Sequence, residues 1–127
     1  MRERFRPGTA TVITSESPSS SFGCVFEDDG VTGYFYAVDR HSGAGILDAV
    51  QIYHVPNLLN RNRDSEAEVQ WSSDGLKAGL FINDQLHAII DFDARVAYGR
   101  SNYPPPAGAW AGVTRIPWRD DLAGLLR

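Results

Sequence analysis

The chain has 127 residues, of which 43% are hydrophobic, and its 16 acidic and 12 basic residues give a formal net charge of −4. This length suits one globular domain, which could bury about 65–70% of the surface of its unfolded form. The acidic balance, without clustered Lys and Arg, excludes a nucleic-acid footprint, and the lack of a run of ~20 apolar residues excludes a membrane span.

The N-terminal part is polar. Three arginines lie among the first six residues, but no apolar run of ~7–15 residues follows them, so no secretion signal is predicted and we expect a cytoplasmic protein. Residues 1–8 are assigned to a solvated end that can fray. Thr9–Thr14 is predicted to be the first strand, and residues 15–21, rich in Ser and Pro, a flexible connection.

The stretch Phe22–Asp39 predicts a β-hairpin. A two-residue turn at Asp29-Gly30 is favoured, because Asp-Gly is among the pairs that accept φ > 0 at both positions. This register places Gly23 and Gly33 opposite aromatic residues, whose rings would cover the bare backbone. A three-residue loop at Asp28–Gly30 with a bulge is the alternative register and would change the cross-strand pairs.

The two faces of this hairpin differ in character. The first is apolar and is assigned to the core; it consists of Phe22, Cys24, Phe26, Phe35 and Ala37. The second is amphipathic, is either a covered layer or a contact surface, and consists of Val25, Tyr34, Tyr36 and Val38. The single cysteine is predicted to be a buried structural thiol. Tyrosine suits an interface because it joins an apolar ring to a polar tip.

Strands and turns alternate up to residue 99. Strands are predicted at Ile46–Val55, Glu66–Ser72, Lys77–Ile82, Gln85–Phe92 and Arg95–Gly99. Apolar and polar side chains alternate strictly in Glu66–Ser72, which is typical of a strand with one solvated face. Asn83-Asp84 is predicted to turn the chain in a second hairpin. The chain therefore contains about seven strands in all.

The remaining residues change character. Arg100–Pro117, with three consecutive prolines, is predicted to be an irregular segment that wraps the sheet and is pinned by Tyr103 and Trp110. Trp118–Leu126 is predicted to be a short helix, because acidic residues lie near its start and leucines share one side. The fold class that follows is mainly β: a single domain of residues 1–127 whose antiparallel sheet curls into a sandwich or partial barrel, with a short C-terminal helix.

Two aspartates are the best candidates for acid–base chemistry. Asp91 and Asp93 would project to one side of an extended chain at ~7 Å, a separation compatible with work on a bound water. Arg100 and Tyr103 follow closely and could complete a polar pocket. The structural alternative is a strand end where Asp93 caps a turn and Asp91 pairs with Arg95 or Arg100.

Signatures of metals, cofactors and nucleophiles are absent from the sequence. His41, His54 and His87 are scattered and form no motif. On one strand, His87 and Asp91 would lie ~13 Å apart, too far to bind one metal ion. No serine lies in a Gly-x-Ser-x-Gly elbow. We therefore predict no metal and no cofactor, and the sequence favours a protein that is not an enzyme.

Several short patterns resemble a known family. They are Gly33-Tyr34-Phe35-Tyr36-Ala37, Ile46-Leu47-Asp48-Ala49-Val50, Ile90-Asp91-Phe92 and Tyr98-Gly99-Arg100-Ser101-Asn102-Tyr103-Pro104. The family they resemble comprises small bacterial proteins catalogued only as a domain of unknown function. The resemblance covers most of residues 22–104 and implies a compact β-rich bacterial domain. It brings no established activity or catalytic residue, and it leaves out the Ser-rich N-terminal part and the C-terminal helix.

The surplus of aromatic strand positions without a chemical motif predicts a non-catalytic protein-binding module, of which an immunity-type inhibitor of a toxin is one version. The residues assigned to binding are Tyr34, Tyr36, Tyr53, Asp91, Asp93, Arg100 and Tyr103. Core packing is the competing use of the tyrosines. The alternative function is a small-molecule binder or small hydrolytic enzyme with a pocket around Asp91, Asp93 and Arg100. Self-association through an exposed edge strand is a third possibility.

Overall fold

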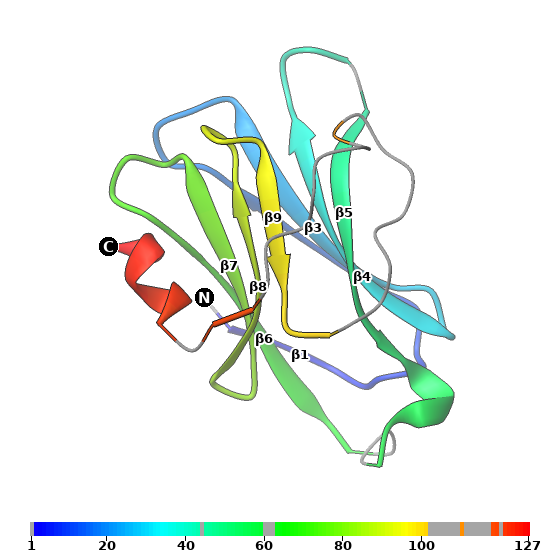
Figure 1. Ribbon diagram of the computed structural model, residues 1–127. Coiled ribbons are helices and arrows are strands. Elements are labelled where there is room, and N and C mark those ends of the chain that lie inside the picture. Colours follow the sequence, from blue (N-terminus) through cyan, green and yellow to red (C-terminus); the bar gives the residue numbers. More distant parts are fainter. Residues whose placement is uncertain (1, 44, 60–62, 102–109, 111–117, 120) are drawn as a thin grey trace.

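The computed structural model describes residues 2–43, 45–59, 63–101, 110, 118–119 and 121–127. In these ranges the chain forms two antiparallel sheets and no closed barrel (Figure 1). The first sheet contains, in spatial order, β1 (Arg2–Phe5), β6 (Ser65–Trp71), β7 (Lys77–Ile82), β8 (Gln85–Asp91) and β9 (Val96–Gly99). The second contains β2 (Thr11–Glu16), β3 (Phe22–Asp28), β4 (Thr32–Asp39) and β5 (Ile46–His54). The predicted mainly-β fold of antiparallel sheets is confirmed.

The main core lies between the two sheets. Its fully buried side chains come from both layers and include Phe26, Phe35, Ala37, Ala78, Leu80, Ala88 and Ile90. Phe5 of β1 meets Phe26 of β3 edge to face, with ring centroids 5.1 Å apart. The Trp71 indole nitrogen donates a hydrogen bond to Ser15 Oγ at 2.9 Å, which links β6 to β2. The predicted core face of the first hairpin is thus in the core, and the buried Cys24 thiol lies on it.

The other face of the first sheet is covered by the C-terminus. A 3-10 helix, η2 (Leu122–Leu126), packs against the sheet in a second apolar cluster (Figure 1). Gly79 lies directly beneath it: a Cβ there would come 2.6 Å from Leu126 Cδ1. The helix is shorter than the predicted Trp118–Leu126, because it begins only at Leu122.

Neither predicted register of the first hairpin is correct. Phe26 pairs with Phe35 and Asp28 with Gly33, and the loop between the two strands is Asp29–Val31. The loop is held by side-chain capping, because Asp29 Oδ1 accepts the backbone N–H groups of Val31 and Thr32 at 2.9 and 2.8 Å. The register differs from the favoured prediction by two residues, and an even shift leaves every side chain on its predicted face.

A bulge in β5 decides where Tyr53 points. Gly33 pairs with Tyr53 while Tyr34 pairs with Gln51, so Ile52 is an extra residue on β5. Such a bulge redirects the side chains beside it. Tyr53 therefore lies in the core, and its ring covers Gly33. An aromatic ring does cover this glycine, as predicted, but the ring belongs to a residue of β5 rather than to a residue of β3.

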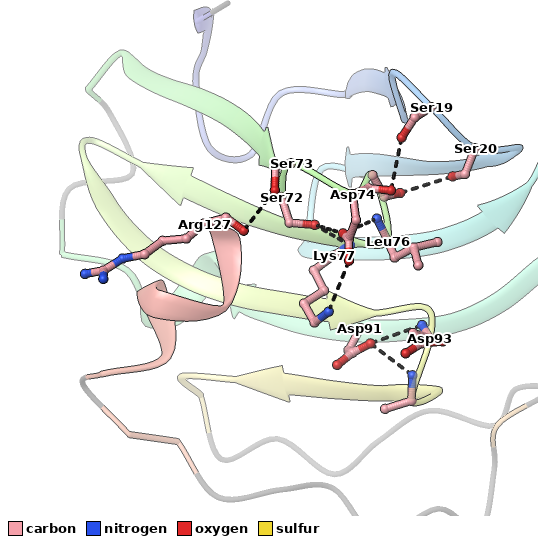
Figure 2. A network of polar contacts seen from close by, with 12 residues as sticks. Ser19, Ser20, Ser72, Ser73, Asp74, Leu76, Lys77, Asp91, Asp93 and Arg127 are labelled. Carbon is pink, nitrogen blue, oxygen red and sulfur yellow. Dashed lines mark hydrogen bonds and ion pairs between the residues drawn. The ribbon is translucent and has the colours of Figure 1, made fainter.

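Two N-terminal segments are tied to the domain by contacts that sequence patterns did not reveal. Arg2–Phe5, assigned to a solvated end, forms β1 on the edge of the first sheet, and Phe5 is buried. The Ser-rich connection is hydrogen-bonded to the turn between β6 and β7 (Figure 2). Ser17 is buried there: its hydroxyl donates to the carbonyl of Gly75 at 2.8 Å and accepts from the N–H groups of Ser19 and Ser20.

We expect Ser17→Ala to lower the free energy of unfolding by about 1–2 kcal/mol, because three backbone groups lose their buried partner. The measurement is chemical denaturation followed by tryptophan fluorescence. Ser73→Ala is the matched control, since Ser73 is exposed and its hydroxyl makes only a long contact of 3.4 Å to the carbonyl of Arg127. Equal stability of the two variants would contradict the anchoring role of Ser17.

Candidate functional site

The outer side of the second sheet carries a half-exposed aromatic surface, here called the tyrosine face. It consists of Val12, Val25, Tyr34, Tyr36, Val38 and Ile46, which lie on all four strands of that sheet. Val12 is 63% exposed and Ile46 is 49% exposed, so large apolar side chains meet solvent at two edges of this surface. The predicted second face of the hairpin is thus an outer layer of the molecule.

The two central tyrosines form an ordered pair. The rings of Tyr34 and Tyr36 stack with centroids 5.7 Å apart and planes 20° apart. The hydroxyl of Tyr36 donates a hydrogen bond to Glu27 Oε1 at 2.9 Å. Burial raises the pKa of Tyr36, and the neighbouring carboxylates of Glu27 and Asp29 raise it further. The phenol therefore stays protonated and fixed, and the pair offers a rigid apolar surface with an acidic border.

Tyr53 does not belong to the tyrosine face. Its hydroxyl donates a 2.6 Å hydrogen bond to Asp28 Oδ2, and Asp28 is 1% exposed. The same carboxylate accepts the N–H of Gly8 at 2.8 Å and, through Oδ1, the N–H of Gly30 at 2.7 Å. Burial, followed by hydrogen bonding to Asp28, raises the pKa of Tyr53. This buried hub, missed by the sequence analysis, joins three separate parts of the chain.

The three charged residues assigned to a pocket do not meet. Asp91 is buried at the end of β8, where Oδ1 accepts the N–H groups of Asp93 and Ala94 at 3.1 and 3.0 Å (Figure 2). Asp91, rather than Asp93, therefore caps the turn. Arg100 lies beside His87, since the backbone N–H of Arg100 donates a hydrogen bond to the His87 carbonyl. Four residues of strand separate His87 from Asp91, or ~13 Å.

Arg100 has its own structural partners. Its Nε donates to the carbonyl of Leu86 at 2.8 Å, and its guanidinium carbon lies 4.8 Å from the ring centroid of Trp118. These contacts place it at the border of the second apolar cluster. Tyr103 lies outside the described residues, as does most of the predicted wrapping segment. Trp110 of that segment is described, and it is buried edge to face against Phe92 at 6.2 Å.

A serine, an aspartate and a lysine lie together at the β6–β7 turn (Figure 2). Ser72 Oγ donates to Asp74 Oδ1 at 2.6 Å and accepts the backbone N–H of Lys77 at 3.0 Å. The Ser72 hydrogen bond, with that of the Leu76 N–H, lowers the pKa of Asp74. Ser72 is 3% exposed, so its hydroxyl is a turn-forming group rather than a nucleophile.

His87 is a second residue whose importance the sequence analysis missed. It is the extra residue of a register shift in β8, because Phe81 pairs with Leu86 while Leu80 pairs with Ala88. Burial lowers the pKa of His87 to about 4, with a smaller contribution from Arg100. The sequence does contain one indication of this site, which is a histidine within an apolar strand. The bulge that determines its position is not visible in the pattern of apolar and polar residues.

We expect the protein to lose stability as the pH falls from 6.5 toward 4. In that window the unfolded state binds a proton at His87 that the folded state does not, so the free energy of unfolding rises with pH. The contribution should be about 2 kcal/mol, because each pKa unit is worth ~1.4 kcal/mol and residual solvent contact weakens the shift. Denaturation between pH 4 and 7 should show a flatter profile for His87→Gln, whereas the exposed His41→Gln should keep the wild-type slope.

Neither a metal-ligand cluster nor a membrane-spanning helix occurs in the described parts of the chain. There, no group of three or more His, Cys, Asp or Glu side chains is placed to hold a metal ion. No helix within the same ranges has the length and apolar character needed to cross a membrane. Cys24 is enclosed in the core, and burial raises the pKa of its thiol, which keeps it protonated and unreactive.

Comparison with known proteins places the chain in a family. An uncharacterized protein of Haemophilus influenzae is 41% identical over 96 residues. The match spans 75% of this chain and 60% of the length of that relative. No solved structure matches the chain. A family model described as "Uncharacterized protein conserved in bacteria (DUF2251)" matches residues 5–126, which extends the resemblance to the last residue of β1, to the Ser-rich connection and to η2. The chain belongs to this bacterial family.

Proposed function

We propose that the chain is a non-catalytic cytoplasmic domain that binds another protein through the tyrosine face. The observation that carries the proposal is the ordered stack of Tyr34 and Tyr36 on an outer sheet face that also exposes Val12 and Ile46. Rigid tyrosines supply contact area at low entropic cost, and apolar patches of this kind mark interaction sites.

The electrostatics favour a basic partner. Glu27 and Asp29 border the tyrosine pair, and Glu16 lies on the same sheet at β2. The nearby Arg40 is engaged by Glu16 at 3.3 Å and by the carbonyl of Ser20 at 2.6 Å. A partner that places a Lys or Arg over the tyrosine rings, beside an apolar side chain, would match both the rings and their border. A basic toxin neutralised by an immunity-type inhibitor is one partner of this kind.

The predicted alternative, a pocket around Asp91, Asp93 and Arg100, gains no support from their placement. One carboxylate oxygen of Asp91 accepts hydrogen bonds from two backbone N–H groups of the turn, and Arg100 lies near the other end of the β8–β9 pair. Neither the aspartates nor Arg100 are among the described residues that line the cleft beside Ile52 and Ile82.

The test is site-specific photo-crosslinking in the native host with a benzophenone amino acid at position 12. The adduct partner is then purified and titrated. We expect a basic partner whose Kd rises at least tenfold for Tyr36→Ala and rises with salt, because screening weakens its contacts with the acidic border. Leu59→Ser is the matched control, since Leu59 is 99% exposed but lies outside the tyrosine face.

Two outcomes would overturn the proposal. In the first, no heterologous adduct forms at position 12 and the protein sediments as a monomer. In the second, the adduct is with another copy of the chain and the mass depends on concentration, which would indicate self-association. A partner that binds Tyr36→Ala as tightly as wild type would also contradict the assigned surface.

A further inference from the structure

A cleft of about 470 Å³ opens at one end of the sandwich. Its walls come from both sheets and from the short 3-10 helix η1 (Val55–Asn57) with the residues after it. Apolar side chains form most of the lining, among them Phe5, Ile52, Leu58 and Ile82. The volume lies within the ~300–1,000 Å³ range typical of small-molecule sites. The cleft is therefore large enough for a ligand and is built largely from the rigid strands.

The charge of the lining limits the ligand. No Asp, Glu, Lys or Arg is among the described residues that line the cleft. A charged ligand would lose hydration there without gaining a counter-ion from any of these lining residues, which is costly. An uncharged molecule with an apolar body would instead be stabilised by the walls. The tyrosine face, with its acidic border, has the opposite character, so the two surfaces suit different partners.

The polar groups of the cleft gather at the β7–β8 side. Gln85 and His87 lie there, and the imidazole of His87 makes no hydrogen bond to any described residue. Asn83 is occupied, because its oxygen accepts the N–H of Glu66 at 3.0 Å and its amide contacts Ser65 Oγ at 3.4 Å. His87 is half-buried, so its ring nitrogens can form a hydrogen bond with a ligand where little water competes. One such hydrogen bond can fix the orientation of the ligand in the cleft.

The rim supplies an independent indication. Leu59 is 99% exposed although it borders the cleft, and the neighbouring Leu58 is only partly buried. A leucine that projects wholly into water gains nothing for folding, whereas a ligand seated in the cleft would give its side chain an apolar neighbour.

We propose that this cleft binds a small uncharged molecule with an aromatic or branched apolar body and one hydrogen-bonding group directed at His87. The body lies against Phe5, Ile52 and Ile82, and the polar group meets the imidazole. This site is distinct from the tyrosine face: its lining includes none of the residues that define that face.

The experiment uses three probes that share one ring. They are p-cresol, which is uncharged at pH 7, 4-methylbenzoate and 4-methylbenzylamine. Each is titrated into the isotope-labelled full chain, with backbone amide signals followed by NMR. We expect p-cresol to cause saturable shifts at Ile52, Ile82 and His87, with both charged probes at least tenfold weaker.

Variants then test the assigned contacts. His87→Leu replaces the imidazole with an apolar side chain of similar size and should raise the Kd of p-cresol about five- to tenfold, the usual loss for one hydrogen bond. Leu59→Ser should also weaken the binding of p-cresol. The exposed side chain of Leu59 is not needed for folding, so this variant should remain folded. Val12→Ala, on the tyrosine face, is the control and should leave the Kd unchanged.

Three results would overturn this inference. They are equal binding of the charged and uncharged probes, shifts that map outside the cleft, and no saturable shift up to the solubility limit of p-cresol. Binding of p-cresol that is unaffected by both His87→Leu and Leu59→Ser would likewise show that the cleft is not the site.

Discussion

Replacing Asp28 with Ala should lower the free energy of unfolding by about 3–5 kcal/mol, because one carboxylate serves three hydrogen-bond donors. The carboxylate is 1% exposed and accepts hydrogen bonds from the N–H groups of Gly8 and Gly30 and from the hydroxyl of Tyr53. Alanine would leave the buried Tyr53 hydroxyl without an acceptor, and it would also remove the acceptor of the part-buried N–H groups of Gly8 and Gly30. Urea denaturation followed by tryptophan fluorescence measures the change.

Two milder variants separate the contributions. Tyr53→Phe removes one donor and leaves the carboxylate its two backbone partners, so its cost should be about 1–2 kcal/mol. Asp28→Asn keeps the shape but turns one acceptor oxygen into a donor that faces other donors, so its cost should fall between those of the other two variants. The hub would be refuted if Asp28→Ala cost no more than Tyr53→Phe.

Gly33→Ala should destabilise the protein by about 2–4 kcal/mol, because a methyl group has no space there. A Cβ on Gly33 would lie 2.6 Å from the ring of Tyr53, and that ring is held by its hydrogen bond to Asp28. The ring therefore cannot move aside without breaking the hub. The same denaturation experiment applies, with thermal unfolding as a second measure.

Gly124→Ala is the control for that variant, since nothing lies within 4 Å of a Cβ at position 124. It should be neutral or slightly stabilising. Combining Gly33→Ala with Tyr53→Leu should cost less than the sum of the two single changes, because the smaller side chain makes room for the methyl group. Strict additivity would mean that the ring and the glycine are not in contact.

Local patterns predicted most of the strands and their faces. Alternation in Glu66–Ser72 and the turn at Asn83-Asp84 both appear in the structure, where Asn83 and Asp84 have φ of 51° and 66°. These features depend on residues that are neighbours in sequence, so they can be predicted from the sequence alone. The core face of the first hairpin was predicted for the same reason, and an even register error did not disturb it.

The features that were missed depend on distant residues. Tyr53 was grouped with Tyr34 and Tyr36, but the bulge at Ile52 turns it inward to reach Asp28 and cover Gly33. A bulge is set by the pairing of two strands, and no periodicity within one strand reveals it. The environment of His87 arises in the same way from a register shift in β8.

The path of the chain through the two sheets has a consequence for folding. β1 belongs to the first sheet, β2 to β5 form the second, and the chain then returns to the first, where Phe5 pairs with Ser65. Closing this contact brings together residues about 60 positions apart, which carries a large entropic cost before any pairing energy is gained. We expect slow, millisecond-to-second folding in a single cooperative transition, in which neither sheet acquires native order while the other is still a random coil.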